Sequence, residues 1–379
     1  MRASAPLQLC VVAHHAYGAM TGGTGGHVGG VERQTSLLCR WLAARGHSVS
    51  LVTWDEGQGD DTVIDGVRLV RVCREDAGLP VLRFFTPRWT SLLAALRRAD
   101  ASVYYHNCAE YVTGQVAHWC RRHGRHFVYS VASDMDVDPA LPELGAWRER
   151  TLYRYGLKAA DRIVVQTRAQ QRQLRQHFAL DGAVLPMPCP GPGEAEYQAP
   201  EPPAAGGVRV LWAGRIAPVK RFELLLDVAR ACPEVGFDVA GMLDAGDAYL
   251  APLLAAAREL PNITLHGAVP RARMPAMYRS AALLLCTSRY EGFPNTFIEA
   301  WSLGIPVVST VDPDGLIAGQ DLGGVADSAA GLAAAIRRVA GDATAWRAMS
   351  ARARDYYVRN HAVDHAMGLF EQMFREVVG

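Results

Sequence analysis

The sequence predicts an α/β protein with two domains, each built on a mainly parallel sheet. At 379 residues the chain is too long for one ordinary hydrophobic core. Short apolar runs alternate with helical patterns in both halves, as in doubly wound α/β domains. A stretch with seven prolines and no strand pattern, residues 186–207, separates the halves. We therefore predict an N-terminal domain at 1–185, a linker at 186–207, a C-terminal domain at 208–355 and a terminal helical segment at 356–379.

Composition excludes several functional classes. Half of the residues are hydrophobic, a fifth are charged, and the net charge is +1, which argues against a broad nucleic-acid-binding surface. No signal peptide is predicted, and no run approaches the roughly 20 apolar residues of a membrane-spanning helix. We expect a cytoplasmic protein, and peripheral contact with the inner face of a membrane is compatible with this sequence. The eight cysteines form no Cys-x-x-Cys pair and no metal-ligand spacing among themselves, which predicts reduced thiols.

The N-terminal half begins with a strand, a glycine-rich loop and a helix. The loop from His14 to Gly30 holds seven glycines. This arrangement can bring backbone amides against a phosphate, and a flexible connector is the alternative. The spacing does not follow the dinucleotide fingerprint, so a nicotinamide cofactor is not predicted. The strands predicted in this half are Leu7–Ala13, Ser48–Thr53, Ser102–Tyr105, His126–Val131 and Arg162–Gln166.

The C-terminal half repeats the alternation of strands and helices. Its most informative stretch runs from Tyr290 to Trp301, between two apolar runs, where Gly292 and Pro294 mark a turn from strand into helix. Ligands of doubly wound sheets bind at the carboxyl ends of strands, and anions bind at helix N-termini. The strands predicted in this half are Val208–Ala213, Phe237–Ala240, Ile263–His266, Leu283–Cys286 and Val307–Ser309.

Two carboxylates, Glu291 and Glu299, flank that turn with seven residues between them. Thr296 and Glu299 also have the spacing of a capping box, in which Glu299 would only satisfy an amide of its own helix. Two cations, Arg215 and Lys220, follow the first strand of this half, where they can meet the charge of a leaving diphosphate without a metal. Ordinary solvated cations are the alternative.

The string from Glu291 to Glu299 resembles the Glu-x7-Glu signature of the retaining glycosyltransferases of family 4. That resemblance implies the GT-B fold, with two Rossmann-like domains facing a central cleft and a terminal helix that returns to the first domain. It also implies that Glu291 lies against the donor sugar, Glu299 binds the ribose, and Arg215 and Lys220 bind the diphosphate. The further donor-binding residues implied are Gly29, Gly30, Gly214, Val269, Gly292, Phe293, Pro294, Asn295 and Thr296. This chain departs from the family in having Arg221 where glycine commonly follows the lysine.

The acceptor side is predicted in the first domain, at His106, Ser133 and Asp134, which stand at strand ends. Residues 133–138 also contain two overlapping Asp-x-Asp strings, a pattern that holds a divalent metal in glycosyltransferases of the other large fold. These acids fall in the first domain and the diphosphate cations in the second. We therefore predict no metal.

The predicted activity is metal-independent transfer of a sugar, with retention, from a nucleotide diphosphate sugar to a hydroxyl acceptor. A UDP-sugar is the expected donor, although nothing in residues 265–270 separates uracil from other bases. The acceptor is a glycan, a lipid-linked or a small-molecule hydroxyl, with no nucleic-acid partner and no cofactor besides the donor substrate. Two alternatives remain: a sugar-nucleotide epimerase on the same fold, and a non-catalytic partner subunit.

Overall fold

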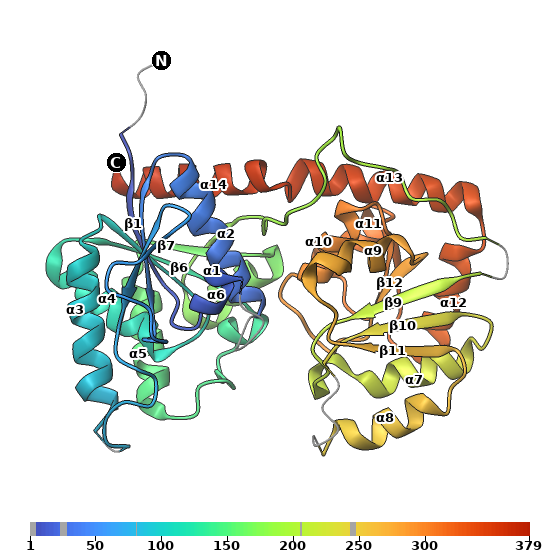
Figure 1. Ribbon diagram of the computed structural model, residues 1–379, viewed down its shortest axis with the longest axis horizontal. Helices are drawn as coiled ribbons and strands as arrows, with labels where there is room; N and C mark the ends of the chain where they lie inside the picture. Colours follow the sequence, from blue (N-terminus) through green and yellow to red (C-terminus); the bar gives the residue numbers. More distant parts are fainter. Residues whose placement is uncertain (1–4, 23–28, 81, 205–206, 243–247) are drawn as a thin grey trace. The chain divides into compact units, whose positions relative to one another are not determined.

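A computed structural model describes residues 5–22, 29–80, 82–204, 207–242 and 248–379. The chain forms two compact units (Figure 1). Unit 1 contains Met1–Pro186 and Ala366–Gly379, and unit 2 contains Met187–His365. The chain thus changes units at the start of the predicted linker, and the predicted terminal segment divides at Ala366.

Unit 1 is built on an eight-stranded sheet in the order β3-β4-β2-β1-β5-β6-β7-β8. Every neighbouring pair is parallel except β3 with β4. The order reverses at β1, which lies between β2 and β5. The strands are β1 (Gln8–Val12), β2 (Ser48–Thr53), β3 (Val63–Ile64), β4 (Val67–Arg71), β5 (Val103–Asn107), β6 (His126–Ser130), β7 (Arg162–Val165) and β8 (Ala183–Val184).

The helices of unit 1 alternate with its strands, and α14 belongs to this unit from Ala366 onward. Tyr105 of β5 contacts Phe374 of α14 edge to face, with ring centroids 5.8 Å apart. Arg375 of α14 donates to the carbonyl of Ala5, so the last helix of the chain packs beside its first strand (Figure 1). The helices are α1 (Tyr17–Thr21), α2 (Gly30–Ala44), α3 (Thr90–Ala99), α4 (Tyr111–His123), α5 (Trp147–Ala159), α6 (Arg168–Phe178) and α14 (Val363–Val378).

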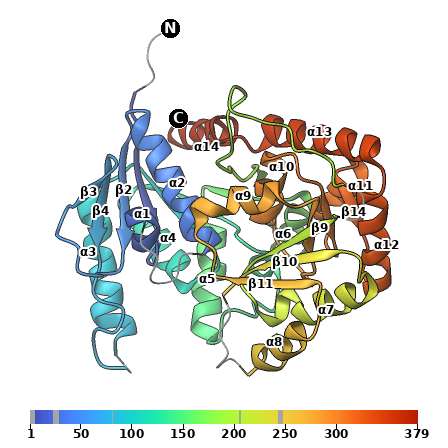
Figure 2. The ribbon, with the colours of Figure 1, turned by 45° about the vertical axis from the view of Figure 1, so that its right-hand side comes forward.

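Unit 2 has a fully parallel six-stranded sheet in the order β11-β10-β9-β12-β13-β14. Separate hydrophobic cores cover its two faces, one with α7 and α12 and the other with α10 and α13. Figure 2 shows α7 and α8 along the β9–β11 strands. The strands are β9 (Arg209–Ala213), β10 (Gly236–Ala240), β11 (Ile263–Gly267), β12 (Leu283–Cys286), β13 (Val307–Ser309) and β14 (Gly323–Val325). The helices are α7 (Phe222–Ala231), α8 (Leu250–Arg258), α9 (Met274–Arg279), α10 (Asn295–Ser302), α11 (Leu316–Gly319), α12 (Ala329–Ala340) and α13 (Ala343–Asn360).

The proline-rich stretch is held against unit 2. The hydroxyl of Tyr357 on α13 donates to the carbonyl of Cys189 at 2.7 Å. Arg354 donates to the carbonyl of Pro192 and lies 4.3 Å above the Tyr197 ring. Gly191 packs so closely that an added Cβ would lie 2.7 Å from Ser302. Much of the predicted linker is therefore packed on α10 and α13, because its backbone carbonyls and the Tyr197 ring contact side chains of these helices.

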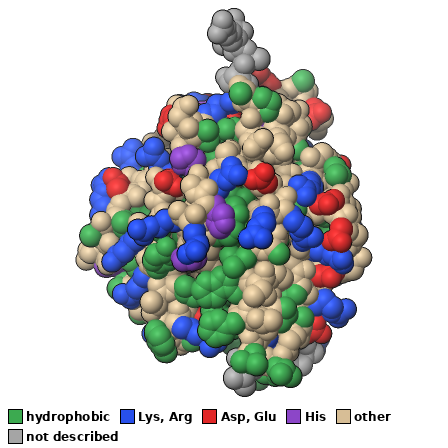
Figure 3. Space-filling model, turned by 90° about the vertical axis from the view of Figure 1, so that its left-hand side faces the viewer, with side chains coloured by type: hydrophobic (Ala, Val, Ile, Leu, Met, Phe, Trp, Pro, Cys, Tyr) green, Lys and Arg blue, Asp and Glu red, His purple; other side chains and the backbone are tan. Residues whose placement is uncertain are grey.

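The structure adds elements that the sequence pattern did not predict. Strands β3, β4, β8 and β14 were not predicted, and helix α1 begins inside the segment predicted as one glycine-rich loop. The middle of that loop, residues 23–28, lies outside the described residues. None of the described helices is long and apolar enough to cross a membrane. Figure 3 shows one face on which basic, acidic and hydrophobic side chains are interspersed.

Candidate functional site

The strand order of unit 2 reverses between β9 and β12, and the loops after these two strands meet there. Nζ of Lys220, in the loop after β9, donates to Oε1 of Glu291, in the loop after β12. The amide of Arg289 donates to the carbonyl of Val219 at 2.8 Å, so the backbones also touch. A reversal of strand order leaves a crevice at the carboxyl edge of a parallel sheet, which is where such sheets bind ligands. Residues 71 positions apart thus form one site.

The carboxylate of Glu291 is largely enclosed and held in place. Its side chain is 17% exposed, and the hydroxyl of Ser288 donates to the same Oε1 at 2.6 Å. Lys220 is 29% exposed. Both side chains are therefore partly accessible to a ligand, and the Ser288 hydroxyl holds the carboxylate in place. Ser288 was missed by the sequence analysis, although it stands directly before the motif.

Arg221 has a left-handed backbone conformation, with a φ of 48°. Glycine adopts such a φ without cost, whereas other residues pay roughly 1 kcal/mol. The guanidinium Nε of Arg221 donates to the carbonyl of Thr287 at 2.9 Å, and the hydroxyl of Thr287 donates to the carbonyl of Lys220 at 2.6 Å. These two bonds join the loops after β9 and β12. Arginine in place of glycine at position 221 therefore costs backbone strain but adds a hydrogen bond between the two loops.

Glu299 does not cap its own helix. Its Oε1 accepts from Nη1 of Arg271 at 2.6 Å, and its Oε2 accepts from the hydroxyl of Tyr278 at 2.9 Å. Pro294 is the N-cap of α10, and no side chain among the described residues makes a capping hydrogen bond to that helix. The alternative of a capping box with Thr296 is therefore wrong. Arg271 was not predicted as a site residue. Its place four residues after the end of β11, at the carboxyl edge of the sheet, could have indicated it.

The predicted diphosphate-binding segment forms the start of α10. Gly292 and Phe293 precede the N-cap, and Asn295 and Thr296 open the helix, whose first amides point out of its N-terminus. The Phe293 ring lies 4.9 Å from His361 and 6.2 Å from Trp301, centroid to centroid, so aromatic contacts fix the turn. Helix N-termini of this kind bind anions.

Glycines keep the neighbouring strand ends free of side chains. The amide of Gly241 donates to the carbonyl of Gly267 at 3.0 Å, and a Cβ on Gly241 would lie 2.5 Å from the carbonyl oxygen of Gly214. The carboxyl ends of β9, β10 and β11 therefore present mainly backbone. Gly241 was not predicted. Arg215, next to Gly214, is exposed and has no hydrogen bond or ion pair within the described part of the chain, and Val269 is half-buried beside α10.

In unit 1 the corresponding reversal lies between β1 and β5, and it gathers neutral groups. His106 is 2% exposed, and its Nδ1 bonds the carbonyl of Val12 at 2.8 Å. The His14 ring packs against the Trp54 ring with centroids 4.1 Å apart and planes tilted by 30°. Burial lowers the pKa of His14 to about 3. Both imidazoles are therefore uncharged at neutral pH.

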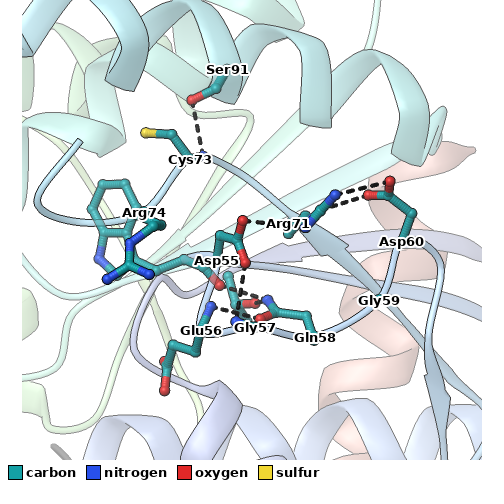
Figure 4. A network of polar contacts seen from close by, with 12 residues as sticks. Asp55, Glu56, Gly57, Gln58, Gly59, Asp60, Arg71, Cys73, Arg74 and Ser91 are labelled. Atoms are coloured by element: carbon teal, nitrogen blue, oxygen red, sulfur yellow. Dashed lines mark hydrogen bonds and ion pairs between the residues drawn. The ribbon is translucent and has the colours of Figure 1, made fainter. Parts of the chain in front are cut away.

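A polar network joins the residues of the loop after β2, from Asp55 to Asp60 (Figure 4). The side-chain amide of Gln58 donates to the carbonyl of Trp54 at 2.6 Å and to the hydroxyl of Thr53 at 3.0 Å. Arg71 holds the two ends of the same loop through Asp55 and Asp60. The loop thus has little freedom, and Trp54 stays against His14.

The Asp-x-Asp strings do not converge on one point. Asp134 accepts from the side-chain amide of Gln170, and the hydroxyl of Ser133 caps the turn by accepting from the amide of Met135. Asp136 is buried and accepts from the hydroxyl of Tyr129 and the amide of Ala132; burial raises its pKa to about 7. These carboxylates serve separate local bonds, which does not fit a shared cation.

Gly29 and Gly30 lie where α2 begins, with Gly29 as its N-cap. The amide of Gly29 donates to Oε2 of Glu32 at 2.8 Å, and a Cβ on Gly29 would lie 2.7 Å from that oxygen. An acid of this chain thus holds the amide that we expected to face a phosphate. A bound phosphate would have to displace the Glu32 carboxylate.

Both units match families of glycosyltransferases. Residues 29–190 match the family described as "Glycosyl transferase 4-like domain", and residues 207–342 match "Glycosyl transferases group 1". The chain is 29% identical over 318 residues to a D-inositol 3-phosphate glycosyltransferase of Mycobacterium leprae, an alignment that covers 75% of this chain and 72% of the relative. It is 31% identical over 167 residues to the same-named protein of Segniliparus rotundus, covering 40% of this chain and 37% of that one.

Solved structures show the same fold. Sucrose-phosphate synthase from Thermosynechococcus elongatus superposes with a TM-score of 0.76 at 20% identity, covering 97% of this chain and 98% of the other. Anabaena HepE in complex with UDP and glucose superposes with a TM-score of 0.72 at 14% identity, covering 97% and 99%. The two family matches together take in most of the chain, and the neighbours share both units: the chain belongs to the family 4 glycosyltransferases and has the GT-B fold.

Proposed function

We propose that the protein transfers a sugar, with retention and without a divalent metal on the diphosphate, from a UDP-sugar to a hydroxyl acceptor. The observation that supports this best is the convergence of Lys220 and Glu291 at the strand reversal of unit 2, beside the N-terminus of α10. One neighbour of this fold is described as a complex with UDP-glucose, which makes UDP-sugars the first donors to test.

The diphosphate is released as a multiply charged anion, so positive charge must meet it as the bond breaks. Lys220, the exposed Arg215 and the first amides of α10 supply that charge in unit 2. Lys220 forms an ion pair with Glu291. A diphosphate competes for Lys220 and leaves the Glu291 carboxylate to face the sugar, where it stabilises positive charge that develops at the ring.

Glu299 takes the ribose. Arg271 and Tyr278 each hold one of its two oxygens, so the carboxylate is oriented before the nucleotide arrives. Each oxygen has further lone pairs that can accept from ribose hydroxyls. The backbone surface at Gly214, Gly241 and Gly267 leaves room for close approach of the nucleotide. Because these contacts exist before and during reaction, they serve affinity more than rate.

The acceptor binds unit 1, where His106, Ser133 and Asp134 stand at the carboxyl edge of the sheet. The imidazoles there are uncharged, which suits a neutral hydroxyl group. Several relatives are named for D-inositol 3-phosphate, so a polyol phosphate belongs in the first acceptor panel.

Product analysis tests the proposal. The purified chain is incubated with UDP-, GDP- and ADP-sugars and an acceptor panel that includes inositol 3-phosphate, and products are identified by mass spectrometry and anomeric NMR. We expect acceptor-dependent release of UDP and a product with the anomeric configuration of the donor. An inverted product contradicts retention. An altered sugar nucleotide formed without acceptor indicates an epimerase, and no turnover with any donor favours a non-catalytic subunit.

Metal independence has its own test. Activity should require no added Mg²⁺ or Mn²⁺, and the double variant Arg215→Ala/Lys220→Ala should lose roughly 10³-fold in kcat/KM, because arginine and lysine clamps on phosphoryl groups carry effects of that size. A matched control replaces two exposed cations of the same unit, Arg258→Ala/Arg279→Ala. Loss of activity in chelator with rescue by Mg²⁺ or Mn²⁺ would overturn this part of the proposal.

A further inference from the structure

Three residues of metal-ligating type, His106, Cys108 and Glu110, stand at alternate positions where β5 ends and the chain turns into α4. The ligand atoms of the three residues all lie within 4.8 Å of one another. Sequence reasoning compared the cysteines only with each other, so this His-x-Cys-x-Glu spacing was overlooked.

His106 is prepared to act as a ligand. Its Nδ1 lies 2.8 Å from the carbonyl of Val12, which can only accept, so the ring proton sits on Nδ1 and the lone pair on Nε2. Nε2 is buried and has no hydrogen-bond partner within the described residues. A buried nitrogen without a partner is costly. Metal-binding histidines typically have this arrangement, with the second nitrogen bound to a backbone carbonyl.

Cys108 and Glu110 are turned toward each other. The thiol Sγ of Cys108 lies 3.7 Å from Oε1 of Glu110. Glu110 is the N-cap of α4 but makes no capping hydrogen bond, so its carboxylate is not used by the helix. Cys108 has a φ of 81°, a strained conformation that needs local compensation. Cys108 and Glu110 therefore present a sulfur and a carboxylate oxygen side by side.

We propose that His106, Cys108 and Glu110 bind one divalent transition-metal ion of the zinc type through Nε2, the thiolate and a carboxylate oxygen. Nitrogen, sulfur and oxygen donors suit Zn²⁺, whose ligands lie at roughly 2.0–2.3 Å. Binding releases the thiol proton to solvent. Three protein ligands leave a fourth tetrahedral position for water or an oxygen of a bound molecule. The site lies within unit 1 and is independent of the diphosphate cations of unit 2.

Metal binding by the full-length chain tests the site without reference to glycosyl transfer. Protein stripped with chelator is titrated with Co²⁺ and followed by its absorption, then with Zn²⁺ in competition. We expect one equivalent, visible tetrahedral bands and a near-ultraviolet thiolate band, and a rise in Tm with Zn²⁺. Cys108→Ser should abolish the thiolate band, and Glu110→Gln should weaken binding by about 10- to 100-fold.

Cys73→Ser is the matched control, because Cys73 is another half-buried thiol that follows a strand of unit 1. It should bind Co²⁺ as the wild type does. If Cys108→Ser does not fold, Glu110→Gln still tests the site. The Tm of each metal-free variant shows whether that variant is folded. The proposal is overturned if the stripped wild type binds no stoichiometric metal, or if both variants keep the wild-type spectrum and affinity.

Discussion

The strand reversals of the two units hold opposite kinds of polar group. In unit 2, Lys220 faces Glu291 and Arg271 faces Glu299, all of them charged and partly exposed. In unit 1, His14 and His106 are buried and uncharged. The same type of sheet thus supports partly exposed ion pairs at the reversal of one unit and buried, uncharged imidazoles at that of the other.

The difference follows from the chemistry each site has to perform under the proposed function. A leaving diphosphate carries several charges and needs cations that can exchange partners, which partly exposed ion pairs can do at low cost. A hydroxyl acceptor is neutral and needs fixed dipoles and exclusion of water. Burial on the acceptor side brings a consequence for stability, because buried titratable groups make unit 1 sensitive to pH.

The largest effect on the charged site is expected from Glu291→Gln. The change keeps the shape and the bond from Ser288 but removes the negative charge that stabilises the transition state. We expect kcat to fall by roughly 10²-fold or more, with donor Kd changed little. Glu259→Gln, an exposed acid on the same unit, is the control and should leave both constants unchanged. Wild-type turnover in Glu291→Gln would remove this residue from the mechanism.

Asp136→Asn tests how the stability of the chain depends on pH through a buried carboxyl group of unit 1. The pKa of Asp136 is raised by burial to about 7 in the folded chain, above its unfolded value near 4. The folded state therefore holds this proton more tightly, so its contribution is fully present below pH 4 and is lost as pH rises through 7. The stability of the wild type relative to Asp136→Asn should fall over that interval, by roughly 1.4 kcal/mol per unit of pKa shift.

Chemical denaturation of both proteins between pH 4 and 8 measures that difference. His14 acts in the opposite direction, because its pKa is lowered to about 3 and it destabilises the fold as pH falls below 6.5. Taking the difference between wild type and variant cancels the His14 contribution. A difference that stays constant with pH would show that folding does not raise the pKa of Asp136.

Much of this fold was predictable because buried parallel strands have a strong local signal. Leu283–Cys286 is an apolar run bounded by turns, and the predicted and observed limits agree. Strand β14, Gly323–Val325, has two glycines in three residues and no such signal; its place comes from pairing with β13. Helix α1 is five residues long and was hidden among glycines.

The partners of the predicted acids were less accessible to sequence reasoning. Glu291 and Glu299 stand in one string, but Arg271 lies 28 positions from Glu299 and reaches it only because of where β11 ends. Whether Glu299 caps its helix or is bound by other side chains could likewise not be decided from the sequence. The answer depends on Tyr278, a buried residue of α9 whose hydroxyl donates to Glu299. Such pairings depend on strand order and helix packing, which spacing along the chain does not encode.

Arg271→Met should act on affinity. Without the guanidinium, Glu299 keeps only Tyr278 and loses its fixed orientation. We expect the donor KM to rise by about 10-fold, equivalent to about 1.4 kcal/mol, while kcat changes little. Glu299→Ala should do the same or more. Arg273→Met is the control, two residues along the same turn. A lower Tm with an unchanged donor KM would show that the Arg271–Glu299 ion pair stabilises the fold and does not bind the donor.

The smallest effect is expected at Arg221, where strain and cross-linking oppose each other in the charged site. Arg221→Gly removes the cost of a φ of 48° and also the bond to the carbonyl of Thr287, which is worth about 1 kcal/mol. The two terms nearly cancel, so the free energy of unfolding should change by less than about 1 kcal/mol. Arg221→Ala loses the bond and keeps the strain, and it should be less stable than Arg221→Gly by roughly 1 kcal/mol. Denaturant titration of the three proteins separates the terms. Equal stability of the glycine and alanine variants would show that this backbone relaxes when the arginine is removed, and that the side chain itself holds the loop in the left-handed conformation.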